Sequence, residues 1–327
     1  MKKYLLGLVT ILAVGFVLVG CSNDNEPEVI GVTPETSVPV VVDENELEPI
    51  DVLVTFSVLA DMTENVGGSL VNVTMIVPIG EDPHEWEVTP GDVINATNAD
   101  IIFYNGLYLE VEYDWFEELM ETAGRVEGVD FFAVTDGIAY YTLRTEGMED
   151  YFDPHAWMDP IRGMEYVNNI AALLSIILPE AADYFAANAE AFNAEIYAIY
   201  NEWTGRFDSI PVERNLVVTT EGAFRYFGYR FGINNDFLWE INSEDEGSPE
   251  QFLRTIAIIN ASEVRYLFLE SSIDPDYMEQ LSAETGVPIF GDYLFTDSLS
   301  EVNGPAGTYL AFLRHNLQTI YTALTAE

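Results

Sequence analysis

Residues 51–77, DVLVTFSVLADMTENVGGSLVNVTMIV, contain two short apolar runs separated by a helical stretch. The runs at 51–57 and 71–77 have the length and the content of β-branched residues that buried strands show. The segment between them continues as a helix to Val66. Two strands joined through a helix run parallel, so this stretch predicts an α/β fold.

The same alternation continues on both sides of a long helical pattern at 180–207. Further strands are expected at 100–106, 128–134, 216–220, 236–241, 266–270 and 287–290. Further helices are expected at 115–122, 161–178, 275–285 and 305–324. For three more the sequence marks one end: one begins at Pro90 behind the N-cap Thr89, one ends near Gly232, and one begins at Ser248. The long pattern would span about 40 Å at 1.5 Å per residue. We therefore predict two lobes, each a small mostly parallel sheet flanked by helices, joined by a long rigid helix.

The predicted divisions of the chain follow from these patterns and from its first residues. They are a signal peptide at 1–21, a flexible tether at 22–50, an N-terminal lobe at 51–178, a connecting helix at 179–208 and a C-terminal lobe at 209–327. Lys2 and Lys3 precede an apolar stretch that is short for a membrane span, which is typical of a signal sequence. The stretch ends in Leu18-Val19-Gly20-Cys21, which resembles a bacterial lipobox and implies a lipidated Cys21; an uncleaved anchor is the alternative.

The charge of the chain is extreme, with 56 acidic residues against 12 basic ones and a net charge of −44. Such a protein repels nucleic acid and anionic lipid. The acidity either attracts divalent cations or reflects adaptation to a salty or alkaline exterior. We favour adaptation, because salt screens attraction beyond about 10 Å. Cys21 is the only cysteine, which excludes disulfides and a thiolate metal site.

Two of the three histidines lie in the same frame, Asp-Pro-His-x-Trp, at 82–86 and 153–157. A neutral imidazole is a common ligand for transition metals, and the proline before it restricts the loop. His84 follows the second predicted strand, where parallel sheets bind ligands. The duplicated frame in a chain with so few histidines predicts that His84 and His155 bind one divalent metal ion.

Six segments, in order, extend this pattern over nearly everything after Glu48. They are DPHEWEVTPGDV, DPHAWMDP, TTEGAFRYFGYRFGI, WEINSEDEGSPEQ, LFLESSID and IFGDYLFTDSL. Together they resemble the metal-binding lipoproteins that supply ABC importers of manganese or zinc, the cluster A-I (cluster 9) solute-binding family. The lipobox is also a feature of that family.

The resemblance implies that four side chains close on one ion, His84 and His155 from the first lobe and Glu221 and Asp297 from the second. Zinc importers of the family usually have a histidine at the third position and a histidine-rich acidic loop after the first ligand. This chain has Glu221 and no such loop, so it resembles the manganese branch, with Fe²⁺ as an alternative. A site with carboxylate oxygens suits Mn²⁺, although zinc binding in vitro would not settle the cargo.

The expected function is therefore capture of Mn²⁺, or of Fe²⁺, by a monomeric extracytoplasmic lipoprotein that delivers it to an ABC permease. It would be anchored at the outer face of the bacterial cell membrane and would not be an enzyme. The alternatives are a zinc-specific member of the same family, a metal-dependent hydrolase, which would keep a coordination position open for water, and a surface adhesin.

Several residues have a structural alternative. Glu221 could favour the N-terminus of the helix that follows it, and Asp297 could be a helix N-cap. Trp86 and Trp157 are expected to pack beside their histidines. For His315 a structural role is expected, and the acidic run at 244–246 is expected to be a solvated loop.

Overall fold

The computed structural model describes residues 47–110, 114–242 and 247–326. The predicted signal peptide with Cys21, most of the predicted tether and the acidic run at 244–246 lie outside these residues. All helices and strands that it describes belong to one unit, Val42–Glu327, and the predicted lobe boundaries within that unit stay a prediction. None of the helices in the described residues combines the length and apolar character that a membrane span requires.

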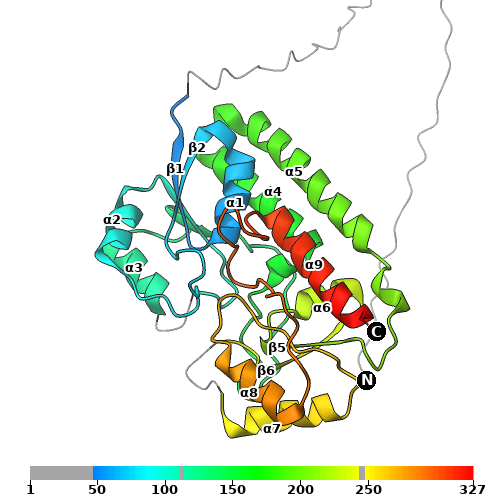
Figure 1. Ribbon diagram of the computed structural model, residues 1–327. Coiled ribbons are helices and arrows are strands. Elements are labelled where there is room, and N and C mark those ends of the chain that lie inside the picture. Colours follow the sequence, from blue (N-terminus) through cyan, green and yellow to red (C-terminus); the bar gives the residue numbers. More distant parts are fainter. Residues whose placement is uncertain (1–46, 111–113, 243–246, 327) are drawn as a thin grey trace, which may run out of the picture. The chain divides into compact units, whose positions relative to one another are not determined.

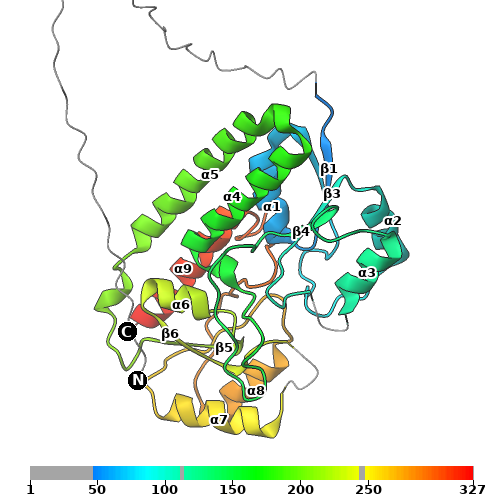
Figure 2. The same cartoon turned by 180° about the vertical axis from the view of Figure 1, so that it is seen from behind.

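The first sheet has four parallel strands in the order β2-β1-β3-β4, of which β1 and β2 are labelled in Figure 1 and β3 and β4 in Figure 2. These are β1 (Ile50–Val54), β2 (Val71–Met75), β3 (Ile101–Tyr104) and β4 (Phe131–Ala133). Val52 and Val54 face the core beneath α1 (Ser57–Gly67), and Leu53 faces the opposite cluster. Helices α2 (Pro90–Asn98) and α3 (Trp115–Ala123) cover that second face. The predicted α/β fold is confirmed, with both faces of the sheet buried.

The second sheet has two parallel strands, β5 (Leu216–Glu221) and β6 (Asn234–Trp239), connected through α6 (Arg225–Phe231). Helices α7 (Pro249–Asn260) and α8 (Asp276–Thr285) pack on it. Val218 of β5, Leu238 of β6 and Leu281 of α8 share this apolar cluster.

The predicted strands at 266–270 and 287–290 are not continuous strands. Residues there form isolated bridges only. The carboxylate of Glu270 accepts the backbone N–H groups of Thr220 and Glu221 at 2.6 and 3.1 Å. These two amides at the end of β5 therefore bond to a side chain, and the backbone ladder that would extend the sheet is interrupted.

Helix α5 (Ala182–Trp203) is the long helix expected from the sequence, and it lies along α4 (Pro160–Ile177) (Figures 1 and 2). Its buried side chains recur every three or four residues: Phe185, Ala189, Phe192, Ile196, Ile199 and Trp203. The helix ends earlier than predicted. Gly205 has a φ of +78°, a left-handed conformation that glycine adopts readily after a helix.

The last helix, α9 (Tyr309–Thr325), contacts both α5 and α1. It begins a few residues later than predicted, because the Thr308 side chain accepts the N–H of Ala311 and caps it there. The largest apolar cluster is continuous and includes residues of β1, α1, α4, α5, α6 and α9. One core therefore joins elements from the two predicted lobes.

Candidate metal centre

The two Asp-Pro-His frames form matching turns. Asp82 Oδ1 accepts the backbone N–H of His84 at 2.8 Å, and Asp153 Oδ1 accepts that of His155 at 3.1 Å. The first turn lies between β2 and α2, and the second lies before α4. In each turn the aspartate bonds the chain two residues on, as Asx turns do, and this fixes the position of the histidine.

The two carboxylates come from the other half of the chain. Glu221 is the last residue of β5, and its Oε1 accepts the N–H of Asn242 at 3.0 Å. Asp297 lies in the segment before α9, where the Ser272 hydroxyl donates to Oδ2 at 3.5 Å. Glu221 is not in the first turn of α6, and no helix in the described residues begins at Asp297. The structural alternatives for these two residues are therefore wrong.

The four side chains converge. One ligand atom from each of His84, His155, Glu221 and Asp297 lies within 4.8 Å of the others. His84 Nε2 is 3.5 Å from Glu221 Oε1, and His155 Nε2 is 3.6 Å from the same oxygen and 3.4 Å from Asp297 Oδ1. Four atoms at ~2.1 Å from a shared ion are ~3.4 Å apart in a tetrahedral arrangement. The observed spacing fits one small cation.

Each of the four residues is at most 1% exposed. Each also has a buried polar atom without a hydrogen-bond partner among the described residues: His84 Nε2, His155 Nε2, Glu221 Oε2 and Asp297 Oδ1. A buried polar atom left without a partner costs about 1–3 kcal/mol, and native proteins rarely retain one. Four of them in one cluster indicate a ligand that bonds to them all, and a cation meets that requirement.

Burial and neighbouring charges set the protonation of the site. Burial lowers the pKa of His84 to about 3, so this ring is neutral. Burial also opposes charge on His155, but the carboxylates of Glu221 and Asp153 outweigh it and raise its pKa well above the ordinary value.

The pKa values of the two carboxyl groups, Glu221 and Asp297, are also shifted in opposite directions. Burial, reinforced by the charge of Asp297, raises the pKa of Glu221 well above its ordinary value. Burial would raise the pKa of Asp297 as well, but His155 beside it lowers that pKa. The raised pKa values of His155 and Glu221 favour a proton held by this pair in the absence of a metal, and a cation must displace it.

Of the two tryptophans expected to pack beside the histidines, Trp157 is confirmed. The ring centre of Trp157 is 5.3 Å from that of His155, as expected, and its Nε1 donates to the carbonyl of Thr296. Trp86 donates to Asp92 at the start of α2, and its packing beside His84 stays a prediction. The indole that supports the first frame is Trp115, whose Nε1 donates to the Pro83 carbonyl at 3.1 Å. No local pattern marks Trp115 for this role.

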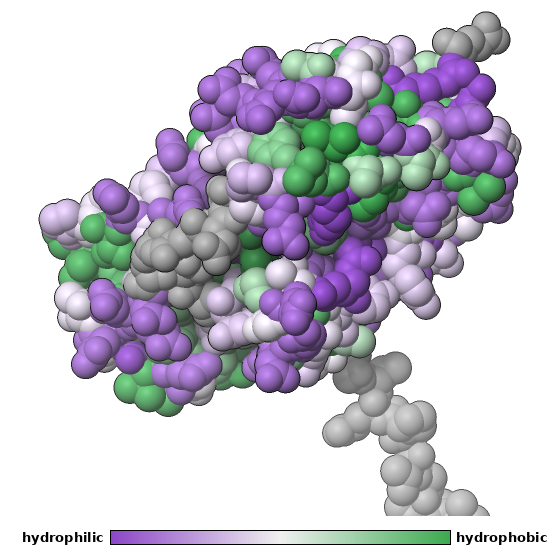
Figure 3. Space-filling view, turned by 90° about the horizontal axis from the view of Figure 1, so that it is seen from below, coloured by the Kyte–Doolittle hydropathy of each residue, from purple (hydrophilic) through white to green (hydrophobic). Residues whose placement is uncertain are grey.

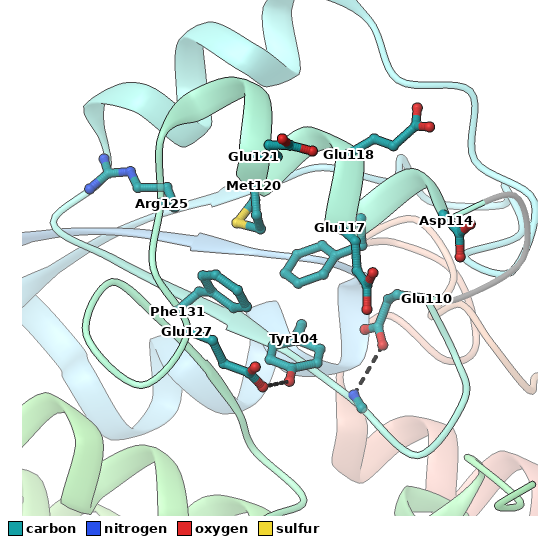
Figure 4. A pocket seen from close by; sticks show the side chains of 12 residues that line it. Tyr104, Glu110, Asp114, Glu117, Glu118, Met120, Glu121, Arg125, Glu127 and Phe131 are labelled. Carbon is teal, nitrogen blue, oxygen red and sulfur yellow. Dashed lines mark hydrogen bonds between the residues drawn. The ribbon is translucent and has the colours of Figure 1, made fainter.

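Two other features lie apart from the four residues. The ring of His315 bonds the carbonyl oxygen of Tyr293 through Nε2 at 2.8 Å. A cavity of about 510 Å³ lies between α3 and the edge of the first sheet, lined by acidic and aromatic side chains (Figure 4). Inside it the Tyr104 hydroxyl donates to Glu127, and Glu110 accepts the N–H of Gly106. None of the four converging residues lines this cavity.

Comparison with known proteins gives many relatives. The chain is 35% identical over 326 residues to a metal ABC transporter substrate-binding lipoprotein of Lactococcus lactis, covering 99% of each chain. It is 37% identical over 278 residues to the manganese ABC transporter substrate-binding lipoprotein PsaA of Streptococcus pneumoniae, covering 85% of this chain and 90% of PsaA. It is also 37% identical over 278 residues to the iron ABC transporter substrate-binding lipoprotein MtsA of Streptococcus pyogenes, covering 85% of this chain and 89% of MtsA.

Two solved structures of metal-binding proteins superpose on this chain. A Mn-bound periplasmic metal-binding protein from Candidatus Liberibacter asiaticus superposes with a TM-score of 0.74 at 32% identity. The periplasmic zinc-binding protein TroA from Treponema pallidum superposes with a TM-score of 0.77 at 28% identity. Each comparison covers 84% of this chain and 99% of the other.

The family described as zinc-uptake complex component A, periplasmic (ZnuA), matches residues 52–323, which include all four converging side chains. The chain thus belongs to the ZnuA family, the cluster A-I metal-binding solute-binding lipoproteins of ABC transporters.

Proposed function

We propose that this chain captures Mn²⁺ outside the cytoplasm and delivers it to an ABC permease. His84, His155, Glu221 and Asp297 bind the ion. The observation that carries this proposal is the cluster of four buried polar atoms, one on each residue, without hydrogen-bond partners among the described residues. The function consists of binding and release, and it needs no chemical conversion of the cargo.

The donor set supports Mn²⁺ over Zn²⁺ as the cargo. Two of its four side chains are carboxylates, and oxygen ligands suit Mn²⁺ better than an all-imidazole site does. A carboxylate can also bind through both oxygens, which raises the coordination number above the four that zinc prefers. The relatives at 37% identity are named for manganese and for iron. Fe²⁺ accepts the same donors and is the first alternative.

Zinc is the second alternative, since the family and TroA are named for zinc. A metal-dependent hydrolase needs a coordination position that stays open to water. The near-complete burial of all four side chains argues against that chemistry.

The anchor and the partner are part of the proposal. A lipid on Cys21 holds the chain at the outer face of the membrane, and the permease receives the ion from the monomeric protein. The support is the lipobox-like end of the predicted signal sequence and the naming of the relatives as lipoproteins of ABC transporters.

The proposal is tested by metal analysis of the protein purified from its own cells, followed by calorimetric titration of Mn²⁺, Fe²⁺ and Zn²⁺ into the metal-free protein. We expect Mn²⁺ in the isolated protein and one site per chain. His84→Ala should abolish tight binding. His315→Ala is the matched control, because it removes a histidine that lies outside the cluster.

Delivery is tested by manganese uptake in cells that lack the protein and are supplied with either variant. Cells with His315→Ala should take up manganese normally, and cells with His84→Ala should not. Full Mn²⁺ binding by His84→Ala, or zinc alone in the isolated protein, would overturn the assignment.

A further inference from the structure

Asn242 follows β6 and is 3% exposed. Its backbone N–H and its side-chain carboxamide make three hydrogen bonds to three different residues. Its backbone N–H donates to Glu221 Oε1 at 3.0 Å. Its Nδ2 donates to Asp82 Oδ2 at 2.5 Å, and its Oδ1 accepts from Trp239 Nε1 at 2.7 Å. The indole bond fixes the orientation of the carboxamide, because only the oxygen can accept from Trp239.

Asp82 completes the connection on the other side. Its Oδ1 accepts the N–H of His84 at 2.8 Å, and its Oδ2 accepts from Asn242. A continuous path of hydrogen bonds therefore runs from Glu221 through Asn242 and Asp82 to His84. The two side chains joined at its centre are 160 residues apart in the sequence.

We propose that Asn242 is a positioning residue whose bond to Asp82 latches the loop of His84 to the strand end of Glu221 and slows release of the metal. This inference rests on the proposed function. For the ion to leave, His84 must separate from Glu221, and the Asn242–Asp82 bond must then break. Breaking a buried hydrogen bond is costly, so the latch slows dissociation.

The residue types suit this role. Asp82 needs a donor in front of Oδ2, and Asn242 supplies one without adding a charge next to the carboxylates of Glu221 and Asp297. An aspartate at 242 would have nearly the same shape and would face Asp82 with a second carboxyl group. Asn242→Asp therefore removes the amide donor of the bond to Asp82 Oδ2 while it keeps the volume of the side chain.

The exchange of the two residues is the decisive variant. In the double variant Asp82→Asn with Asn242→Asp, the amide at 82 donates to the carboxylate at 242. The oxygen at 82 still accepts from His84, and an oxygen at 242 still accepts from Trp239. The net charge is that of the wild type, so the latch is rebuilt with its donor and acceptor exchanged.

The experiment measures the rate of Mn²⁺ release from the full-length protein into excess chelator by stopped flow. We expect about tenfold or faster release for Asn242→Asp and for Asp82→Asn, and a rate within about threefold of wild type for the exchange. The ratio of Mn²⁺ to Zn²⁺ affinity should not change in any variant, because the four ligands remain. Thr145→Val is the matched control: it removes a bond to Glu240, two residues from Asn242, without touching the latch.

Release from Asn242→Asp at the wild-type rate, or an exchange no slower than the single variants, would overturn the latch while the proposed function stands. If Asn242→Asp does not fold, Asn242→Ala removes the amide without adding charge and takes its place. Wild-type protein that binds Zn²⁺ but not Mn²⁺ would overturn the proposed cargo, and the same rates measured with Zn²⁺ would then decide the latch. A wild type that binds neither ion would overturn both.

Discussion

His84 and His155 lie in two copies of the same five-residue frame, but the groups around the two rings differ. His155 Nδ1 lies 2.9 Å from Asp153 Oδ1, and its Nε2 lies near two further carboxylates. Its pKa is raised for this reason, whereas burial dominates at His84 and lowers the pKa. The carboxylate on Nδ1 also orients the ring so that Nε2 points to the cluster.

This difference predicts that metal binding releases protons. The raised pKa values of His155 and Glu221 mean that this pair keeps a proton to higher pH than the free groups would, and the pair must lose it to bind a cation. Affinity should therefore rise with pH, and about one proton should be released per ion. Calorimetry in buffers of different ionisation enthalpy measures this number. Equal affinity between about pH 5 and pH 8 without proton release would contradict it.

The third ligand position should set metal preference. Glu221→His replaces a carboxylate with a third imidazole, which favours zinc over manganese. We expect the ratio of Zn²⁺ to Mn²⁺ affinity to rise by about tenfold or more in competition titrations, because Mn²⁺ loses an oxygen ligand. His315→Ala, outside the site, is the control, and an unchanged ratio in Glu221→His would show that this position does not set selectivity.

How far the site could be predicted differs between its residues. The histidines were marked by a repeated frame in a chain with only three of them. The carboxylates had no such mark, because Glu221 and Asp297 are two of 56 acidic residues, and only the family resemblance singled them out. The contacts of Trp115 and Asn242 join segments far apart in the chain, and no local pattern encodes them.

At the scale of elements, the starts of α2 and α7 were predicted correctly. Thr89 with Asp92, and Ser248 with Gln251, form capping boxes at the predicted starts of α2 and α7. Such caps are local, so residues within one turn determine them. The strand expected at 266–270 failed where the carboxylate of Glu270 takes the backbone amides of Thr220 and Glu221. At 287–290 the structure has only an isolated bridge between Leu267 and Ile289.

The contact between α1 and α9 predicts a pH effect on stability. Asp61 on α1 accepts the N–H of Tyr309, the first residue of α9, at 2.9 Å, and burial raises the pKa of this carboxyl to about 6. Between about pH 4 and pH 6 the folded protein holds a proton that the unfolded chain has lost, so stability falls as pH rises through this range. Asp61→Asn keeps an acceptor oxygen and cannot ionise.

We expect Asp61→Asn to reduce the loss of unfolding free energy between about pH 4 and pH 6 by an amount on the order of 1 to 2 kcal/mol. Urea unfolding of the metal-free protein at pH 4, 5, 6 and 7 provides the measurement. A variant whose stability follows the same pH profile as the wild type would show that this carboxyl does not contribute.

At the scale of the whole molecule, one apolar core connects the predicted lobes. Helix α5 packs against α1, α4 and α9, and the largest cluster includes Val52 of β1, Phe227 of α6 and Phe312 of α9. A wide opening would expose this core to water, which the hydrophobic effect opposes. The sequence predicted a rigid helical connector, and the shared core gives a further physical reason for limited movement.

We therefore expect small changes on metal binding. The radius of gyration from X-ray scattering should differ by less than about 1 Å between metal-free and Mn²⁺-loaded protein. A rotation of tens of degrees between the halves would contradict this.

The acidic composition of the chain is a property of its surface and is separate from the buried cluster of four residues. Figure 3 shows hydrophilic residues over much of one face, with apolar residues in separate patches. With a net charge of −44, mutual repulsion keeps such molecules apart in solution. Only two of the four converging residues, Glu221 and Asp297, belong to the 56 acidic residues, so the overall acidity and the cation cluster are separate properties.

The order of the converging residues along the chain has a consequence for biosynthesis. The imidazoles at 84 and 155 emerge from the ribosome long before the carboxylates at 221 and 297. A nascent chain that has not reached residue 297 lacks the complete donor set. Such a chain cannot hold a cation as the folded protein does, so metal loading is deferred until synthesis and folding are complete.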